Sequence, residues 1–263
     1  MDNLIIENLK TKIGKYIWPL CINKLIFLGR RLTHQWKRIY LTNSSISGAI
    51  SIWDLGRERR LCFTEWLDPV SQSIIFTHGN WTELQREYFG HALKPPCDLP
   101  DHPRVLILGL GGGTMVHLAH QLLRPKNITA VELDPVVVEV AQTYMGINKI
   151  SNLEFIVEDV HSALIKLQSH EKFDLIVEDI FYQGFPNESE NFEREYLHKI
   201  FSCLNECGVL SFNRWYKSYS GKEIDGGQEL LVKHLKELFE QVVCKKIAQR
   251  WQNEIIYAFN SNQ

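Results

Sequence analysis

The chain has 263 residues, of which 44% are hydrophobic and 23% are charged, which predicts a packed core and excludes a disordered or collagen-like chain. The formal net charge is -2, from 29 Lys and Arg against 31 Asp and Glu, so an overall basic surface for nucleic acid or anionic lipid is excluded. Six scattered cysteines without a CxxC pair favour reduced thiols and a cytoplasmic protein over a disulfide scaffold or a zinc module.

Residues 1–45 are interpreted as a basic N-terminal extension. Residues 1–40 carry eight Lys and Arg residues against two acids, and Pro19 interrupts a partial helical stripe. Docking on the protein body or simple solvation is favoured, while contact of this segment with a membrane surface stays open. No signal peptide or membrane span is expected, because Asn23 and Lys24 break the longest apolar stretch.

Residues 46–100 are predicted to form a small β unit and a linker helix. Three apolar, β-rich runs are separated by turn sequences, which is typical of a small antiparallel sheet. These runs are Ala49–Trp53, Leu61–Trp66 and Ser73–Phe76. A helical stretch over Trp81–Leu93 ends before a Pro-Pro pair, and the following linker to Pro103 marks a domain boundary.

Residues 101–263 alternate between predicted strands and helices, which indicates a parallel sheet with helices on both faces. The strands of this pattern are 105–108, 128–133, 153–157, 173–177 and 209–212, and the helices are 115–123, 136–144, 161–167, 192–204 and 229–239. Two further strands, 242–247 and 254–259, have no helix between them and are expected to be antiparallel. We therefore predict a seven-stranded, mostly parallel sheet that ends in an antiparallel hairpin.

The residues directly after the first two of these strands are candidates for ligand binding, because ligands of doubly wound sheets bind beyond the carboxyl ends of the strands. Gly109, Gly111 and Gly113 let the backbone approach a ligand at a helix N-terminus, and a plain tight turn is the alternative. Glu132 stands where an acid accepts hydrogen bonds from ribose hydroxyls, and a capping role beside Asp134 is the alternative.

Acid pairs follow the next two strands, Glu158-Asp159 and Glu178-Asp179. Each pair alone is equally compatible with solvated loop acids, but together with Glu132 the pairs would ring one crevice with carboxylates. Such a ring repels the pyrophosphate of a dinucleotide, and Thr114 replaces the third glycine of GxGxxG. The ring instead favours a ligand with ribose hydroxyls, an adenine amine and a cationic sulfonium.

The motifs taken together resemble spermidine synthases and their relatives, which are polyamine aminopropyltransferases built on the class I methyltransferase fold. The resemblance covers roughly residues 60–259. The motifs that carry it are the run from Val105 to Thr114, Ala130-Val-Glu-Leu-Asp-Pro, Glu158-Asp159, Phe173 to Asp179, and Gly208-Val-Leu. It implies an α/β, Rossmann-like doubly wound seven-stranded sheet with a small N-terminal β unit.

The resemblance also implies roles for residues at matching positions. Three glycines, Gly109, Gly111 and Gly113, would line the nucleoside. Glu132 would hold the ribose, Asp159 would reach the adenine amine, and Asp179 would be the catalytic acid–base residue.

Four weaker candidates would contact the acceptor substrate: Gln72, Gln85, Tyr182 and Trp215. Gln72 matches a Gln-Ser pair in the family's β unit, and Gln85 is the nearest match to its Tyr-Gln pair. Trp215, with Tyr216 and Tyr219, forms either hydrophobic cover or an aromatic lid. The family carries an acid after the third glycine and another three residues after the catalytic Asp, where this chain has Thr114 and Tyr182. Without these acids, selection of polyamine cations is weakened.

Three functions follow as hypotheses. The first is transfer of an aminopropyl group from decarboxylated S-adenosylmethionine to a polyamine or another amine; the alternatives are methyl transfer from S-adenosylmethionine and nucleoside binding without catalysis. The expected partner is a small-molecule amine and not a nucleic acid, while a homodimer stays open. No metal is expected, because His117 and His120 have helical spacing but no third ligand.

Overall fold

The computed structural model describes residues 36–67, 73–169, 172–182, 185–186, 194–216, 228–248 and 252–260. Residues 1–35, Gln72 and Tyr219 lie outside this part of the chain, and Tyr182 is described in its backbone alone. Among the described helices, none combines the length and the hydropathy that crossing a membrane requires.

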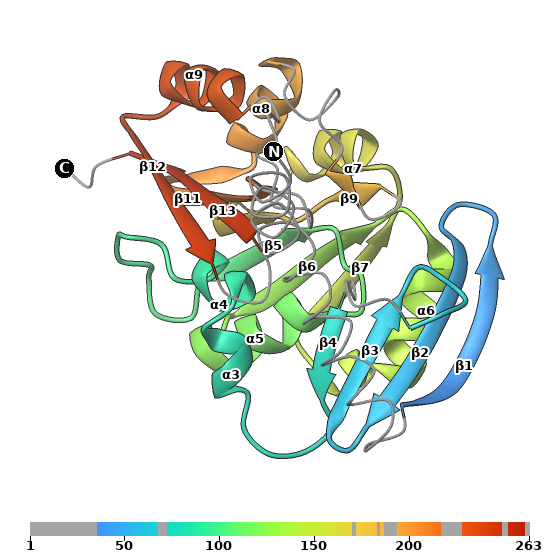
Figure 1. Ribbon diagram of the computed structural model, residues 1–263. Helices are drawn as coiled ribbons and strands as arrows, with labels where there is room; N and C mark the ends of the chain where they lie inside the picture. Colours follow the sequence, from blue (N-terminus) through green and yellow to red (C-terminus); the bar gives the residue numbers. More distant parts are fainter. Residues whose placement is uncertain are drawn as a thin grey trace, which may run out of the picture.

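Seven strands form one sheet in the order β12-β13-β11-β8-β5-β6-β7 (Figure 1). Neighbouring strands from β11 to β7 are parallel, and every connection between them carries a helix. The hairpin of β12 and β13 pairs antiparallel with β11 and completes the sheet. The strands are β5 Arg104–Leu108, β6 Asn127–Glu132, β7 Leu153–Val157, β8 Phe173–Glu178, β11 Leu204–Trp215, β12 Gln241–Ala248 and β13 Gln252–Phe259. The predicted seven-stranded doubly wound sheet and its terminal hairpin are confirmed.

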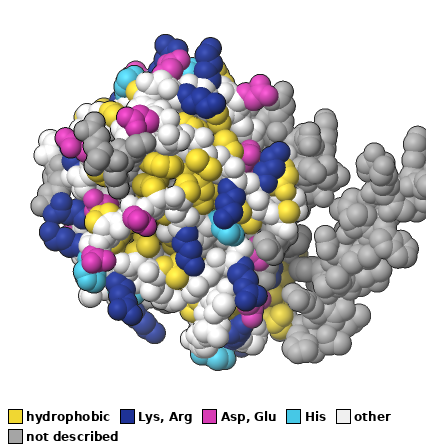
Figure 2. Space-filling view, turned by 90° about the vertical axis from the view of Figure 1, so that its left-hand side faces the viewer, with side chains coloured by type: hydrophobic (Ala, Val, Ile, Leu, Met, Phe, Trp, Pro, Cys, Tyr) yellow, Lys and Arg dark blue, Asp and Glu magenta, His cyan; other side chains and the backbone are white. Residues whose placement is uncertain are grey.

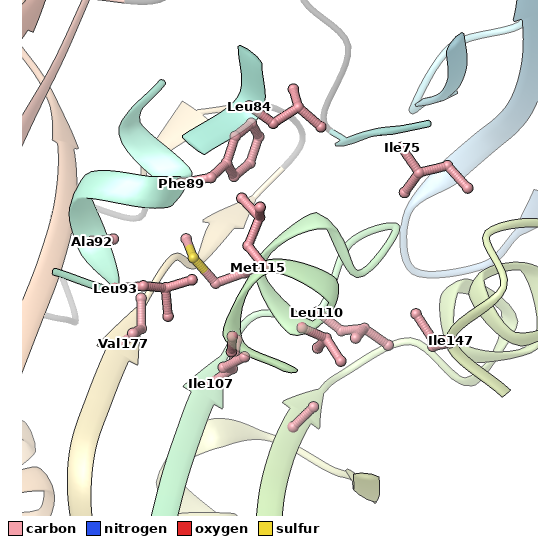
Figure 3. Packing of buried hydrophobic residues seen from close by; sticks show 14 of the residues in the cluster. Ile75, Leu84, Phe89, Ala92, Leu93, Ile107, Leu110, Met115, Ile147 and Val177 are labelled. Carbon is pink, nitrogen blue, oxygen red and sulfur yellow. The ribbon is translucent and has the colours of Figure 1, made fainter. Parts of the chain in front are cut away.

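Helices cover both faces of this sheet, because successive strand residues point to opposite faces. In β5, Val105 and Ile107 join the hydrophobic cluster of the face that carries α4, α5 and α6, whereas Leu106 and Leu108 join the cluster under α7, α8 and α9. Figure 3 shows Met115 of α5 directly above Ile107 of the sheet. The helices are α3 Thr82–Gln85, α4 Tyr88–Ala92, α5 Thr114–Leu123, α6 Pro135–Tyr144, η1 Ile147–Lys149, α7 Val160–Leu167, α8 Arg194–Phe201 and α9 Gln228–Leu238.

A four-stranded antiparallel sheet precedes the large sheet and packs beside α6 (Figure 1). Its strands are β1 Lys37–Ser44, β2 Gly48–Leu55, β3 Glu58–Cys62 and β4 Ser73–Phe76. The sequence reasoning predicts the sheet but misses β1, which lies within the range 1–45 assigned to the extension, and it places β3 too late at Leu61–Trp66. The ring of Tyr40 in β1 stacks on Tyr144 of α6 with centroids 4.4 Å apart. Tertiary packing therefore stabilises β1, although the basic residues of this part of the sequence suggest an exposed segment. The division of the chain into domains stays a prediction.

Two predicted helices end earlier or break. The stretch predicted over Trp81–Leu93 is two short helices, α3 and α4, which separate at Arg86 and Glu87. Gly90 of α4 lies so close to the Gln85 carbonyl group that any Cβ there would overlap it, so the glycine permits this approach. The helix predicted over 192–204 is described as α8, which ends at Phe201. Leu204 instead begins β11, where it pairs with Phe173 of β8.

Charges of both signs are interspersed on the side of the molecule shown in Figure 2. The described Lys, Arg, Asp and Glu side chains surround a central patch of hydrophobic side chains, and no large field of one sign is visible on that face. This distribution agrees with the near-neutral net charge and gives no electrostatic footprint for nucleic acid there.

Candidate active site

The carboxyl ends of β5, β6, β7 and β8 lie in one row at the same edge of the sheet. Three backbone hydrogen bonds continue the strand pairing into the loops. They run from Gly109 N to Val131 O (3.0 Å), from Glu158 N to Glu132 O (3.0 Å) and from Asp179 N to Leu108 O (2.8 Å). The candidate residues after the four strands are therefore gathered at one edge, where doubly wound sheets bind their ligands.

Gly109 is where the glycine loop and Asp179 approach each other most closely. Its φ of 94° lies in the left-handed region, and a Cβ at this position would overlap the carbonyl oxygen of Asp179. Glycine alone satisfies both conditions. The loop ends at Gly113, the N-cap residue of α5, so the backbone N–H groups of a helix N-terminus open at the same place.

The small sheet holds the glycine loop from the other side. Gly112 N donates a hydrogen bond of 2.7 Å to Ser73 Oγ. The hydroxyl of Thr114 donates to Ile74 O (2.8 Å) and accepts from Ile74 N (2.9 Å). Thr114 is buried, and its hydroxyl makes these two hydrogen bonds with strand β4. This attachment could not be predicted from the sequence, because it depends on how the two sheets pack.

Glu132 is anchored inside the glycine loop. Its Oε2 accepts hydrogen bonds from Leu110 N (3.2 Å) and Gly111 N (3.3 Å), and its Oε1 accepts from Asp134 N (3.1 Å). Burial raises the pKa of Glu132, and these backbone hydrogen bonds act in the opposite direction. Asp134 itself caps α6, because its Oδ1 accepts from Val136 N at 2.9 Å. A capping role for Glu132 is therefore unnecessary, and the carboxylate has a fixed orientation.

Asp159 and Glu158 follow β7 and lie nearer the surface. Asp159 caps α7, since its Oδ1 accepts from His161 N (3.0 Å) and Ser162 N (3.3 Å). Glu158 forms an ion pair of 2.6 Å with Lys166. The predicted contact of Asp159 with an adenine amine stays a prediction, and it would have to use the carboxylate oxygen that does not cap α7.

Two apolar side chains at the ends of neighbouring strands are unusually exposed. Leu133, directly after Glu132, is 45% exposed, and Val157 at the end of β7 is 47% exposed. Val157 pairs with Glu132 in the sheet register. Apolar surface is therefore available beside the Glu132 carboxylate, where a flat base could cover it.

Asp179 is the candidate with the most perturbed carboxyl group. Burial raises its pKa to about 7, and a hydrogen bond from Asn213 opposes this shift. The Asn213 Nδ2 atom donates to Asp179 Oδ1 at 2.6 Å. A carboxyl group with a pKa near neutrality can take up or release a proton under physiological conditions, which general acid–base catalysis requires.

Three polar residues beyond the sequence-predicted set belong to the hydrogen-bond and ion-pair partners of the Glu178-Asp179 pair: Asn213, Asn253 and Arg214. Asn253 Nδ2 donates to Asn213 Oδ1 at 2.7 Å, which continues the contact of Asn213 with Asp179 into the terminal hairpin. Arg214 forms a buried ion pair with Glu178. The signal in the sequence is a row of polar residues inside otherwise apolar strands, but their partners depend on strand register.

The structure describes the side chains of two of the four candidates for binding the acceptor amine, and these two lie in different elements. Trp215 ends β11, and its ring lies 5.4 Å from that of Phe181, which closely follows Asp179 in the chain. This ring pair joins the end of β11 to the segment that follows Asp179. Gln85 is half-buried at the end of α3, and the structure does not bring it into contact with Asp179. Gln72 and the side chain of Tyr182 lie outside the described residues.

Of the two histidine residues, His117 has packing contacts, whereas His120 is exposed. A ring nitrogen of His117 lies 2.8 Å from Met145 O, and its ring contacts that of Trp81 with centroids 4.9 Å apart. Burial lowers the pKa of His117. In the part of the chain that the structure describes, no group of three or more His, Cys, Asp and Glu side chains is arranged to hold a metal ion.

The profile of the spermine/spermidine synthase domain matches residues 84–242, which include the glycine loop, Glu132 and Asp179. The chain belongs to this family. The predicted resemblance is therefore confirmed at the level of the family.

Among curated proteins, the chain is similar to both aminopropyltransferases and methyltransferases. It is 29% identical over 155 residues to the polyamine aminopropyltransferase of Vibrio vulnificus, covering 59% of this chain and 48% of that protein. It is 30% identical over 116 residues to the eEF1A lysine and N-terminal methyltransferase of Danio rerio, covering 41% of this chain and 17% of that protein. The chain spans from 11% to 48% of the length of such relatives.

Solved structures with the same fold include members of both groups. Spermidine synthase in complex with the transition-state analogue AdoDATO aligns with a TM-score of 0.62 and 17% identity, over 86% of this chain and 74% of that one. Human methyltransferase-like protein 13 in complex with SAH aligns with a TM-score of 0.55 and 22% identity, over 69% of this chain and 83% of that one. At these identities the likeness establishes the fold.

Proposed function

We propose that this protein transfers an aminopropyl group from decarboxylated S-adenosylmethionine to a polyamine or another small amine. The observation that carries the proposal is the position of Asp179. The pKa of this half-buried residue is raised by desolvation to about 7, and its backbone lies against Gly109 of the glycine loop. A group suited to proton transfer is thus adjacent to the place where a nucleoside would bind.

The donor side of the site suits an adenosine-type sulfonium. Glu132 is held by three backbone N–H groups, and the remaining lone pair, on Oε1, would accept a hydrogen bond from a ribose hydroxyl. Leu133 and Val157 offer exposed apolar surface for the base. The carboxylates at the strand ends would favour a cationic sulfonium and disfavour a pyrophosphate.

The proposed step is a direct displacement. The nitrogen of the acceptor amine attacks the aminopropyl carbon bonded to sulfur, so that a C–N bond forms as the C–S bond breaks. The electron pair of the broken bond goes to sulfur, which leaves as neutral 5'-methylthioadenosine. The Asp179 carboxylate takes the proton that the amine loses.

Methyl transfer from S-adenosylmethionine is the second candidate. Two observations favour it: the similarity to the eEF1A lysine and N-terminal methyltransferases, and the commitment of Thr114 to Ile74, at the position where the resemblance implies an acid. A binding protein without catalysis is the remaining alternative.

Product analysis distinguishes the three. The purified protein is incubated with decarboxylated S-adenosylmethionine and putrescine or spermidine, and in parallel with S-adenosylmethionine and the same amines. We expect 5'-methylthioadenosine from the first reaction. S-adenosylhomocysteine from the second reaction alone would assign the protein to methyl transfer, and binding of both donors without any product would assign it to binding.

A further inference from the structure

The side chains of Asp179, Asn213 and Asn253 form a row on one face of the sheet. They come from the end of β8, from β11 and from β13, which are neighbouring strands. Phe212 of β11 pairs with Glu178 of β8, so Asn213 lies beside Asp179, which directly follows β8. Asn213 in turn pairs with Ile255 of β13. Asn253 stands two residues before Ile255 and therefore shares its face. The row thus runs from the hairpin to the candidate acid.

The hydrogen bonds along the row have one direction. Asn253 Nδ2 donates to Asn213 Oδ1 at 2.7 Å, and Asn213 Nδ2 donates to Asp179 Oδ1 at 2.6 Å. Both asparagine residues are fully buried. An asparagine amide has one accepting end and one donating end, so the contact with Asn253 fixes the donating end of Asn213 toward Asp179.

We propose that Asn213 and Asn253 are positioning residues, which orient the Asp179 carboxylate and keep it ionised near neutral pH for the acceptor amine. The inference deepens the proposed function and rests on it for the role in the reaction. The orientation and ionisation of Asp179 are properties of the protein alone, and they can be measured without turnover.

Among the groups near Asp179, the Asn213 amide acts most strongly to keep the carboxyl group ionised. Burial raises the pKa of Asp179, and the Asn213 hydrogen bond is the main opposing influence. Among the described residues, the charged groups that act on Asp179 are Glu178, which raises the pKa, and Arg214, which lowers it. Glu178 and Arg214 form a buried ion pair with each other, so their charges act on the pKa of Asp179 in opposite directions. A base that must be ionised to accept a proton therefore depends on the neutral amide donor.

Ser211 provides a matched control. It lies two residues before Asn213 on the same face of β11 and is also fully buried. Its hydroxyl has no hydrogen-bond partner within the described residues. Ser211→Ala therefore changes a buried polar group in the same strand without touching Asp179.

The test is a carbon-13 NMR titration of the Asp179 carboxyl in the full chain, with the signal assigned by its loss in Asp179→Asn. Asn213→Leu should raise the pKa of Asp179 by about one unit or more, because a hydrogen bond to a charged group is removed. Asn253→Leu should raise it by less, because the Asn213 amide is retained but no longer oriented. Ser211→Ala should leave it unchanged. The acidic limb of the pH–rate profile should move upward by the same amounts.

An unchanged or lowered Asp179 pKa in Asn213→Leu would overturn the proposal, as would an equal rise in Ser211→Ala. A rise in Asn213→Leu without one in Asn253→Leu would overturn the role of Asn253. If Asn213→Leu does not fold, Asn213→Ser serves the same comparison, because its shorter side chain withdraws the donor from Asp179. Absence of aminopropyl transfer in the unmodified protein would contradict the proposed function and leave the titration as an independent result.

Discussion

Adjacent acids acquire different properties at the end of β8. Glu178 points to the face under α7, α8 and α9, where it is fully buried and paired with Arg214. Asp179 points to the other face, where Asn213 is its hydrogen-bond donor. The charge of Glu178 is compensated by a cation, whereas Asp179 has a neutral donor and a pKa raised by burial. The alternation of a strand therefore separates a structural acid from a candidate catalytic one.

Sequence position alone could single out Glu132 and Asp179 as candidates, because one ends and the other directly follows a strand in a recognisable βα pattern. It could not predict Asn213 or Asn253. These residues are 40 positions apart, and their contact exists through the register of β11 with β13. A register shifted by one residue would turn either side chain to the opposite face.

We predict that Glu132→Gln weakens binding of an adenosine-type donor about tenfold or more. A charge-assisted hydrogen bond from a ribose hydroxyl to this carboxylate contributes on the order of 1.5–3 kcal/mol. Calorimetric titration with S-adenosylmethionine, its decarboxylated form and 5'-methylthioadenosine measures the change. Glu154→Gln is the control, since that exposed acid lies near the amino end of β7, away from the candidate site, and should leave affinity unchanged. Equal affinities for the unmodified protein and Glu132→Gln would remove Glu132 from the site.

The glycine loop connects two sheets and the candidate acid. Gly109 lies against the Asp179 backbone, while Gly112 and Thr114 are bound to β4 of the small sheet. The sequence predicts the loop, because glycines follow a buried strand and precede a helix. Its attachment to β4 is tertiary packing that no local pattern encodes. The break between α3 and α4 and the strand β1 are hidden from sequence reasoning for the same reason.

For this element we predict that Gly109→Ala abolishes measurable donor binding or prevents folding. A methyl group at this position would combine a strained φ of 94° with overlap of the Asp179 carbonyl. Gly56→Ala is the control: Gly56 also has a positive φ, 58°, but a Cβ there would have no neighbour within 4 Å. It should cost only the strain of about 1–2 kcal/mol and retain donor binding, as measured by urea unfolding and calorimetry. Similar stability and binding in the two variants would contradict the close approach of the loop to Asp179.

The four-stranded antiparallel sheet packs beside the doubly wound sheet, and both sheets contribute residues to the edge where the candidate site lies. Arg59 of β3 donates to Tyr144 O of α6 at 2.6 Å, and the stacked rings of Tyr40 and Tyr144 support the same contact. The mostly parallel character of the large sheet and its terminal antiparallel hairpin could be predicted from alternation and from the resemblance to a family. The way the small sheet docks could not, because its contacts join residues that are far apart in the chain.

Aminopropyl transfer as proposed here requires Asp179 to accept the proton of the amine. The most direct measurement compares 5'-methylthioadenosine release by the unmodified protein and by Asp179→Asn, with donor binding measured on the same samples. Glu154→Gln, which changes an exposed acid of β7, is the control. We predict a rate about a hundredfold to ten-thousandfold lower in Asp179→Asn, with donor affinity nearly unchanged and Glu154→Gln fully active. Release at an undiminished rate by Asp179→Asn would contradict the account.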